Sequence, residues 1–232
     1  MKKYAGFLFD ADNTLFDYDR AETEALDETL AEAAPSVPRE AARAEYRRIN
    51  AGWWRLFEQG SVSLAVLKVG RFADLLRALD VGGDAAFVAE GYLTRLSRRA
   101  YFLPGARDLV VSLARSAPLG IVTNGISVVQ RGRLEKSGIG HCFSALLISE
   151  ELGCAKPDPR FFAAACAAMG LPAAQLLCVG DNPVTDVQGA LAAGIDACWY
   201  APRGEPWRGP GAPPTFTVRR LDEIAGLAAP GT

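Results

Sequence analysis

Hydrophobic and polar positions follow two different patterns along the chain. Residues 4–9 form a short apolar run that stops at Asp10, a pattern typical of a buried strand. From residue 20 to residue 98, apolar side chains instead recur every three or four positions, as Leu26, Leu30 and Ala33 do, which places them on one face of a helix. Glycine and proline interrupt this stretch, so we expect a module of about four helices.

Beyond Pro104, strand-like and helix-like segments alternate. The expected strands are 119–123, 145–149, 176–179, 197–200 and 215–218, and the expected helices are 105–115, 128–137, 159–169 and 184–193. Such alternation predicts a parallel sheet that is covered on both faces. The predicted fold class is therefore α/β. A Rossmann-like parallel sheet core comprises residues 1–16 and 101–232, and a helical bundle is inserted over residues 17–100. Ligands bind beyond the carboxyl ends of strands in open sheets, so we expect the insertion to be a cap over the site.

The composition limits the partners of the chain. Its 25 lysines and arginines nearly balance 27 aspartates and glutamates, so it lacks the positive charge that nucleic acid or an anionic membrane attracts. Residues 161–180 are uncharged, but Gly170 and Pro172 interrupt them and argue against a membrane span. The five cysteines include no C-x-x-C pair, and no signal-peptide pattern is recognisable. We predict a cytoplasmic protein without nucleic-acid or membrane partners, and the sequence leaves monomer and homodimer open.

Polar side chains occur where the predicted strands end. Two carboxylates spaced two residues apart can face one cavity and suit a cation, and further carboxylates at another strand end could complete an oxygen site for Mg²⁺. A hydroxyl and backbone N–H groups at a helix start suit a phosphate, and a lysine could neutralise it. Taken singly, most of these groups could equally be a turn, a helix cap or an exposed loop lysine. The residues are Asp10, Asp12, Thr123, Asn124, Lys156, Asp181 and Asp186.

In this order, the groups resemble the four motifs of the haloacid dehalogenase-like (HAD) hydrolase superfamily, helical-cap type. Within it the chain is most similar to the pyrimidine 5'-nucleotidase branch. Two positions depart from the usual pattern: Asn13 stands where glycine is frequent, and Asn182 where serine is frequent. Asparagine tolerates a left-handed backbone nearly as well as glycine. Residues 180–186 carry the fourth superfamily motif, and the similarity to the nucleotidase branch is carried by residues 7–16, 103–107, 121–125, 148–153 and 194–199.

The resemblance implies a Mg²⁺-dependent phosphomonoester hydrolase. Asp10 would be the nucleophile that forms an aspartyl-phosphate, and Asp12 the general acid and base. Thr123, Lys156 and the backbone N–H of Asn124 would hold the phosphoryl oxygens. Mg²⁺ would be held by the Asp10 carboxylate, the backbone carbonyl of Asp12 and Asp181, and Asp186 would belong to the metal site by orienting a water ligand. The expected partner is a small-molecule phosphomonoester, in the first place a pyrimidine nucleoside monophosphate.

Several alternatives share parts of this pattern. A sugar phosphate, phosphoglycolate or a phosphomutase reaction would use the same catalytic residues, and a non-catalytic protein on this fold is the alternative from another class. A dehalogenase would not need Asp12, because halide leaves unprotonated, and a phosphonate hydrolase would need a cap lysine, for which Lys68 is the candidate. The C-x5-R spacing from Cys154 to Arg160 matches a cysteine phosphatase, but two prolines remove backbone donors from that loop. Trp53, Trp54 and Phe57 could pack the cap or stack on a base.

Overall fold

The computed structural model describes residues 2–229 and divides into two compact units. The first combines the described residues up to Tyr18 with those from Ala100 onward, and the second comprises Asp19–Arg99. The second unit is therefore an insertion into the first unit, and it follows the first strand of that unit.

A six-stranded sheet forms the centre of the first unit. The strand order is β3-β2-β1-β4-β5-β6, and every neighbouring pair is parallel. The chain thus starts in the middle of the sheet, extends it on one side through β2 and β3, and returns to the other side of β1 with β4. The strands are β1 (Gly6–Phe9), β2 (Leu119–Thr123), β3 (Ala145–Ile148), β4 (Leu176–Gly180), β5 (Asp196–Tyr200) and β6 (Phe216–Val218).

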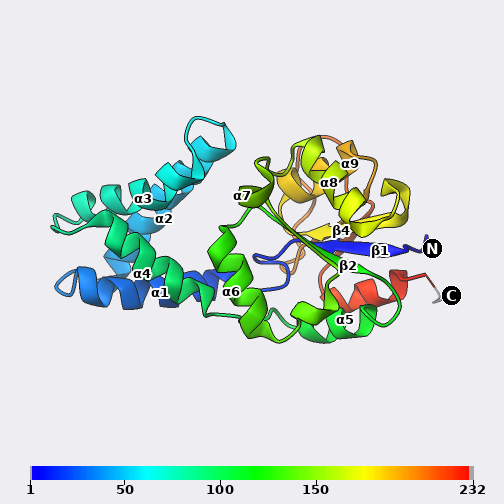
Figure 1. Ribbon diagram of the computed structural model, residues 1–232, viewed down its shortest axis with the longest axis horizontal. Coiled ribbons are helices and arrows are strands. Elements are labelled where there is room, and N and C mark those ends of the chain that lie inside the picture. Colours follow the sequence, from blue (N-terminus) through cyan, green and yellow to red (C-terminus); the bar gives the residue numbers. More distant parts are fainter. Residues whose placement is uncertain (1, 230–232) are drawn as a thin grey trace. The chain divides into compact units, whose positions relative to one another are not determined.

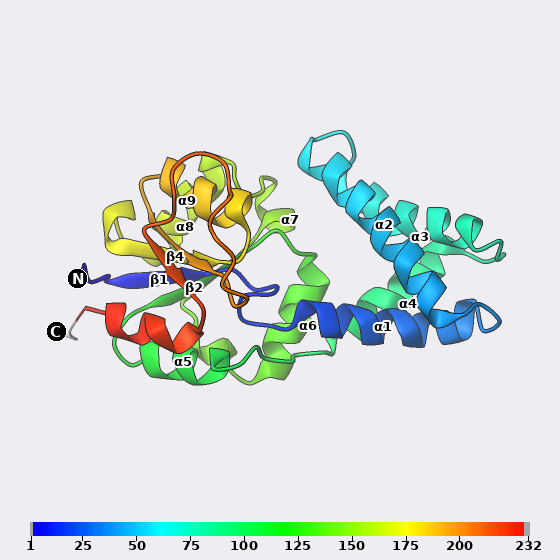
Figure 2. The ribbon, with the colours of Figure 1, turned by 180° about the vertical axis from the view of Figure 1, so that it is seen from behind.

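Helices cover both faces of this sheet because its strands carry apolar side chains on both faces (Figures 1 and 2). Phe7 and Phe9 point to the face covered by α5 (Ala106–Leu113) and the 3-10 segment η4 (Leu221–Leu227). Leu8 points to the opposite face, where α8 (Pro159–Met169) and α9 (Gly189–Ala192) pack. The remaining segments are α6 (Ser127–Ser137), η1 (Gly140–Cys142), α7 (Ser149–Leu152), η2 (Ala173–Gln175) and the π-helical η3 (Pro183–Gln188).

The register of the strands brings several strand ends to one edge of the sheet. Phe9 pairs with Ile121 of β2 and with Val179 of β4, so β1, β2 and β4 end close together. The backbone N–H of Asp10 donates to the Val179 carbonyl at 2.9 Å and extends the ladder by one residue. In both views α6 lies beyond these carboxyl ends. This edge is where open α/β sheets bind ligands.

The second unit is a helical bundle with a core of its own. Its helices are α1, which starts at the boundary of the first unit (Tyr18–Ala33), α2 (Arg39–Glu58), α3 (Leu64–Ala78) and α4 (Ala85–Ser97). Ser63 and Asp84 cap α3 and α4 through their side-chain oxygens. The buried Arg71 guanidinium lies over the rings of Tyr46, Phe72 and Tyr92.

The predicted α/β fold class with an inserted helical bundle is confirmed. The differences are local: Ser149 begins α7 instead of ending a strand, the segment η4 was not expected, and the helix expected over 184–193 starts as a π-helix. Asn182 explains that start, because its Oδ1 accepts from the backbone N–H groups of Val184 (2.8 Å) and Thr185 (3.1 Å).

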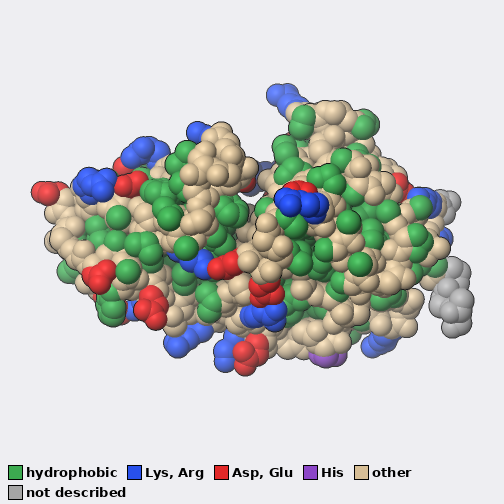
Figure 3. Space-filling model, turned by 45° about the horizontal axis from the view of Figure 1, so that its top comes forward, with side chains coloured by type: hydrophobic (Ala, Val, Ile, Leu, Met, Phe, Trp, Pro, Cys, Tyr) green, Lys and Arg blue, Asp and Glu red, His purple; other side chains and the backbone are tan. Residues whose placement is uncertain are grey.

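Three further observations bear on the sequence predictions. The five cysteines are free thiols. Within the described residues, no helix has both the length and the apolar character that a membrane crossing requires. On the face drawn in Figure 3, basic and acidic side chains are interspersed.

Candidate functional site

A buried lysine and two buried carboxylates form the centre of the candidate site. The Lys156 ammonium donates to Asp10 Oδ1 at 2.7 Å, to Asp186 Oδ1 at 2.6 Å and to the Val122 carbonyl at 2.8 Å. These partners account for the three N–H bonds of the ammonium. Lys156 is 2% exposed, so its charge is neutralised inside the protein rather than by water.

Asp181 joins Asp10 and Asp186 in a cluster of three carboxylates. Among the described residues, one oxygen from each lies within 4.8 Å of the other two. Thr14 Oγ1 is 3.4 Å from Asp181 Oδ1, and the Trp199 indole N–H donates to the Asp181 carbonyl at 2.8 Å. Three oxygen ligands at this spacing fit a hard divalent cation such as Mg²⁺.

The charges of the cluster explain the pKa directions. Burial raises the pKa of Asp10 well above its usual value, and the neighbouring carboxylates of Asp186 and Asp181 add to this against the opposing effect of Lys156. Burial, followed by the charge of Asp186, raises the pKa of Asp181 to about 7. For Lys156, burial alone would lower the pKa, but the carboxylates of Asp10 and Asp186 more than offset it and the pKa lies above its usual value. A cation bound here would relieve the repulsion between the carboxylates.

The position of the Asp186 side chain in the cluster requires glycine at position 180. The Asp186 side chain turns back over the end of β4, where its Oδ2 accepts from the Asn182 backbone N–H at 3.0 Å. A Cβ at Gly180 would overlap the Asp186 carboxylate. Position 180 therefore has to be glycine for Asp186 to occupy this place, although its backbone is an ordinary strand.

Thr123 and Asn124 organise the loop beside the cluster. Thr123 Oγ1 accepts from the Gly125 backbone N–H at 3.0 Å. The Asn124 amide makes two 2.8 Å hydrogen bonds with the backbone of Lys156, donating to its carbonyl and accepting from its N–H. The Asn124 side chain thus fixes the segment that carries Lys156, which leaves its backbone N–H as the group predicted to bind phosphate. The N-terminus of α6 is approached by a protein carboxylate, since Ser127 N–H donates to Glu150 Oε2 at 2.8 Å.

Asp12 is not one of the three clustered carboxylates, and its side chain contacts α6. Its Oδ2 accepts from Gln130 Nε2 at 2.8 Å, and its Oδ1 pairs with Arg133 Nη1. Gln130 and Arg133 are not among the site residues predicted from the sequence. The available signal was weak: a glutamine and an arginine three residues apart share one face of a helix that also buries Val129.

The other candidates from the sequence lie elsewhere. Trp53 packs within the second unit and donates to Asp74 Oδ2 at 3.0 Å, and Trp54 meets Phe57 edge to face. Arg160 is exposed and pairs with Asp158 at 2.6 Å. It therefore does not line a phosphate loop with Cys154.

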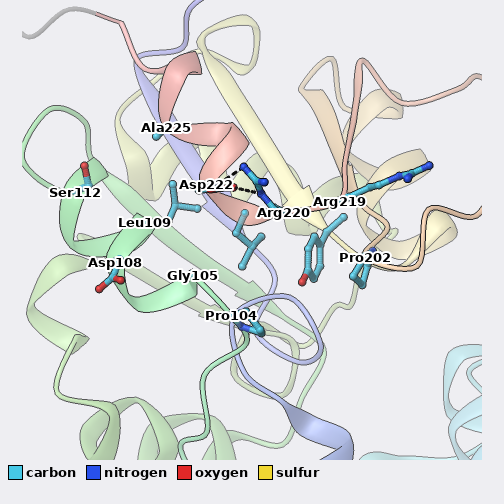
Figure 4. Close-up of a pocket in the computed structure, with 12 residues that line it drawn as sticks. Pro104, Gly105, Asp108, Leu109, Ser112, Pro202, Arg219, Arg220, Asp222 and Ala225 are labelled. Carbon is cyan, nitrogen blue, oxygen red and sulfur yellow. Dashed lines mark hydrogen bonds and ion pairs between the residues drawn. The ribbon is translucent and has the colours of Figure 1, made fainter.

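A separate pocket lies at the ends of β5 and α5. Its cavity volume is about 560 Å³, and its lining includes Leu109, Tyr200 and Leu221 but none of the predicted site residues. Figure 4 shows Arg220 turned onto Asp222, with an Nε–Oδ1 distance of 3.0 Å. This pairing leaves no unbalanced charge from these two residues for a ligand.

Comparison with known proteins places the chain among related hydrolases. A family model described as haloacid dehalogenase-like hydrolase matches residues 4–194. YfnB of Bacillus subtilis, which carries the name HAD-hydrolase, is 34% identical over 97% of this chain and 95% of that protein. Its crystal structure, bound to magnesium, has a TM-score of 0.87 and covers 97% of this chain and 98% of that one, at 32% identity.

Two of the relatives are pyrimidine 5'-nucleotidases by name. The pyrimidine 5'-nucleotidase YjjG of Escherichia coli is 32% identical over 97% of this chain and 98% of that protein. The pyrimidine 5'-nucleotidase PynA of Streptococcus pneumoniae is 36% identical over 86% of this chain and 84% of that protein. The similarity to both therefore includes the inserted helical unit as well as the sheet.

Proposed function

Because the chain belongs to the haloacid dehalogenase-like hydrolase family, we propose that it is a Mg²⁺-dependent phosphomonoester hydrolase that acts through an aspartyl-phosphate. One observation supports this most: Asp10 shares a buried cluster with Lys156, Asp181 and Asp186 at the carboxyl ends of the strands. This cluster combines a nucleophile (Asp10), the positively charged ammonium of Lys156 and the further carboxylates of Asp181 and Asp186. Asp12, two residues after Asp10, provides another carboxylate that could protonate the leaving group.

The first step transfers the phosphoryl group to Asp10. A carboxylate oxygen of Asp10 attacks phosphorus, the bond from phosphorus to the ester oxygen breaks, and its electron pair stays on that oxygen. Asp12 donates a proton to the same oxygen, and the alcohol leaves. In the second step a water oxygen attacks phosphorus, Asp12 takes a proton from that water, and the bond between phosphorus and Asp10 breaks. Ester and water thus become alcohol and inorganic phosphate.

Mg²⁺ would be held by the carboxylates of Asp10, Asp181 and Asp186 together with the backbone carbonyl of Asp12. The donor set fits, because it consists of oxygens, its carboxylate oxygens lie within 4.8 Å of one another, and burial raises the pKa values of Asp10 and Asp181. When bound, the ion supplies positive charge that offsets the repulsion between an anionic nucleophile and an anionic substrate.

Thr123, Lys156 and the backbone N–H of Asn124 would orient the phosphoryl group. Lys156 is already 2.7 Å from Asp10 Oδ1, so its charge lies next to the oxygen on which the phosphoryl group would be carried. The clamp from the Asn124 amide to the Lys156 backbone fixes this arrangement. Preorganised positive charge of this kind stabilises a transition state in which charge moves between oxygens.

For the substrate we propose nucleoside monophosphates, pyrimidine nucleotides in the first place. Two relatives similar over both units are pyrimidine 5'-nucleotidases by name. The helical unit would act as the cap that selects the leaving group and excludes water. A cytoplasmic location stays a prediction.

Phosphate release from a panel of phosphomonoesters tests the proposal. The panel contains UMP, dUMP, dTMP, AMP, a sugar phosphate and phosphoglycolate, each with Mg²⁺ and with a chelator, on the wild type and on Asp10→Asn. We expect Mg²⁺-dependent release that favours pyrimidine nucleotides and disappears in Asp10→Asn. A preference for sugar phosphates would overturn the nucleotidase proposal, and no release from any ester would favour a mutase or a non-catalytic protein.

A further inference from the structure

Two side chains of α6 hold the two oxygens of the Asp12 carboxylate separately. Gln130 Nε2 donates to Oδ2 at 2.8 Å, and Arg133 Nη1 pairs with Oδ1. Because each oxygen has its own partner, both the position and the rotation of the carboxylate group are defined. Gln130 is 4% exposed and Arg133 is fully buried, whereas the Asp12 side chain remains 27% exposed.

Arg133 also contacts the segment that leads into α1. Its guanidinium lies over the Phe16 ring at 5.5 Å and over the Tyr18 ring at 5.6 Å from the ring centres. Phe16 in turn packs against Phe102, with ring centroids 5.2 Å apart. One buried cation thus contacts Asp12, the Phe16 ring and the ring of Tyr18, the first residue of α1.

The place of Gln130 depends on a glycine in the neighbouring loop. A Cβ added to Gly125 would lie 2.9 Å from Gln130 Cδ and 3.0 Å from its Cγ, and closer still to its amide nitrogen. Gly125 is not among the residues with positive φ, so alanine would suit its backbone conformation. Alanine at position 125 would therefore move the Gln130 side chain without removing it.

We propose that Gln130 and Arg133 are positioning residues that hold the Asp12 carboxylate where it can exchange a proton with the leaving oxygen. The inference rests on the proposed function, in which Asp12 protonates that oxygen as the phosphorus–oxygen bond breaks. Within the described residues, the side-chain hydrogen bonds and ion pairs of Gln130 and Arg133 join them to Asp12 and not to Asp10, Asp181 or Asp186. Their loss is therefore expected to weaken proton transfer more than nucleophilic attack.

Esters with different leaving groups distinguish a loss of proton transfer from a loss of nucleophilic attack. An alkyl alcohol, such as the 5'-hydroxyl of a nucleoside, leaves slowly unless it is protonated in the transition state, whereas p-nitrophenolate leaves without a proton. Release of nucleoside from the best nucleotide and of p-nitrophenolate from p-nitrophenyl phosphate would be measured in single turnovers. A single turnover isolates the first step, so the use of Asp12 as a base in the second step does not enter.

We expect Gln130→Ala to slow alcohol release from the nucleotide by about 10- to 100-fold, within the range of general acid catalysis, and to slow p-nitrophenolate release much less. Gly125→Ala should show the same selective loss. In Gly125→Ala/Gln130→Ala the losses should not add, because both changes act on one side chain. Arg133→Lys, which keeps the charge but not the planar fork, should retain more activity on the nucleotide than Arg133→Met.

Arg131→Gln is the matched control on the same helix. Arg131 is exposed and pairs with Glu151 instead of Asp12, so both esters should react as in the wild type. Equal losses on the two esters in Gln130→Ala, or wild-type rates on both, would overturn the inference. A wild type that releases phosphate from neither ester would defeat the proposed function and the inference with it, and this outcome is distinct because it appears before any variant is made.

Discussion

At the scale of single residues, the site depends on charges that lack free access to water. Lys156 and Asp186 are each 2% exposed and Asp10 is 7% exposed, so each charge depends on its protein partners. The buried lysine offsets part of the carboxylate charge, while burial and then the neighbouring carboxylates raise the pKa values of Asp10 and Asp181. The remaining repulsion between the carboxylates would favour binding of a divalent cation.

Mg²⁺ binding is expected to depend on pH through Asp181. Its pKa is 3.8 in the reference state and about 7 in the fold, so between these values the folded chain holds a proton that the unfolded chain has lost. The contribution of Asp181 to stability therefore falls as pH rises from about 4 to about 7. Mg²⁺ competes with this proton, so thermal unfolding should show a larger Mg²⁺-induced rise in Tm at about pH 8 than at about pH 5.5.

Asp181→Asn should remove most of this pH-dependent difference, whereas Asp222→Asn, at an exposed pair with Arg220, should keep it. An equal Mg²⁺-induced rise at both pH values in the wild type would contradict the assignment of Asp181 to the cation site.

Gly180→Ala tests the fit of Asp186 over the end of β4. The added Cβ would overlap the Asp186 carboxylate and push it away from Asp10 and Asp181. We expect the Mg²⁺-induced rise in Tm to become small and the phosphatase rate to fall by about 10-fold or more, as for misplaced catalytic groups. Gly226→Ala, where a Cβ meets nothing within 4 Å, is the control and should behave as the wild type. Retained Mg²⁺ stabilisation in Gly180→Ala would show that Asp186 is not needed there.

The sequence predicted which residues gather at the sheet edge but not how each side chain is oriented. Asp10, Lys156 and Asp181 could be placed together because parallel strands end at one edge. The direction of the Asp12 carboxylate depends on Gln130 and Arg133, which approach from a helix more than a hundred residues later. The hydrogen bonds from the Asn124 amide to the Lys156 backbone likewise join two loops that lie 32 residues apart in the sequence. Such contacts follow from packing across the sheet edge rather than from local pattern.

At the scale of elements, the boundaries depend on single polar residues. Strand positions followed from apolar runs, and helix positions from apolar periodicity. Apolar periodicity did not predict the π-helical start at Pro183, where the Asn182 side chain accepts from the backbone N–H groups of Val184 and Thr185. The start of α1 depends similarly on Asn13, whose φ is 59° and whose Oδ1 accepts from the Tyr18 backbone N–H at 3.1 Å. This left-handed backbone was expected from asparagine at this position.

Two substitutions at Asn13 distinguish the contribution of its side-chain hydrogen bond from that of its left-handed backbone. Asn13→Gly keeps an easy left-handed backbone and loses only the hydrogen bond from the Tyr18 N–H, a loss of about 1 kcal/mol. Asn13→Ala loses the same bond and adds left-handed strain of about 1–2 kcal/mol. Chemical denaturation should therefore rank the free energy of unfolding as wild type, then glycine, then alanine. A glycine variant less stable than the alanine variant would contradict this account of the turn.

At the scale of the whole molecule, the chain combines two units with separate hydrophobic cores. The sheet unit contains every residue that the sequence predicted for catalysis, and the helical unit interrupts it after the first strand. The alternating pattern after residue 104 predicted the first unit, and the three-to-four-residue spacing before it predicted the second. The substrate could not be predicted in this way, because the leaving group is recognised by individual side chains rather than by the arrangement of elements.

The most direct test of the central claim is whether Asp10 carries a phosphoryl group during turnover. The wild type would be mixed with Mg²⁺ and its best phosphomonoester, quenched in acid during steady state, digested and analysed by peptide mass spectrometry. The proposed mechanism predicts phosphorylation of the peptide that contains Asp10, at that residue, with none in Asp10→Asn. Turnover without phosphorylated Asp10, together with retained activity in Asp10→Asn, would contradict it.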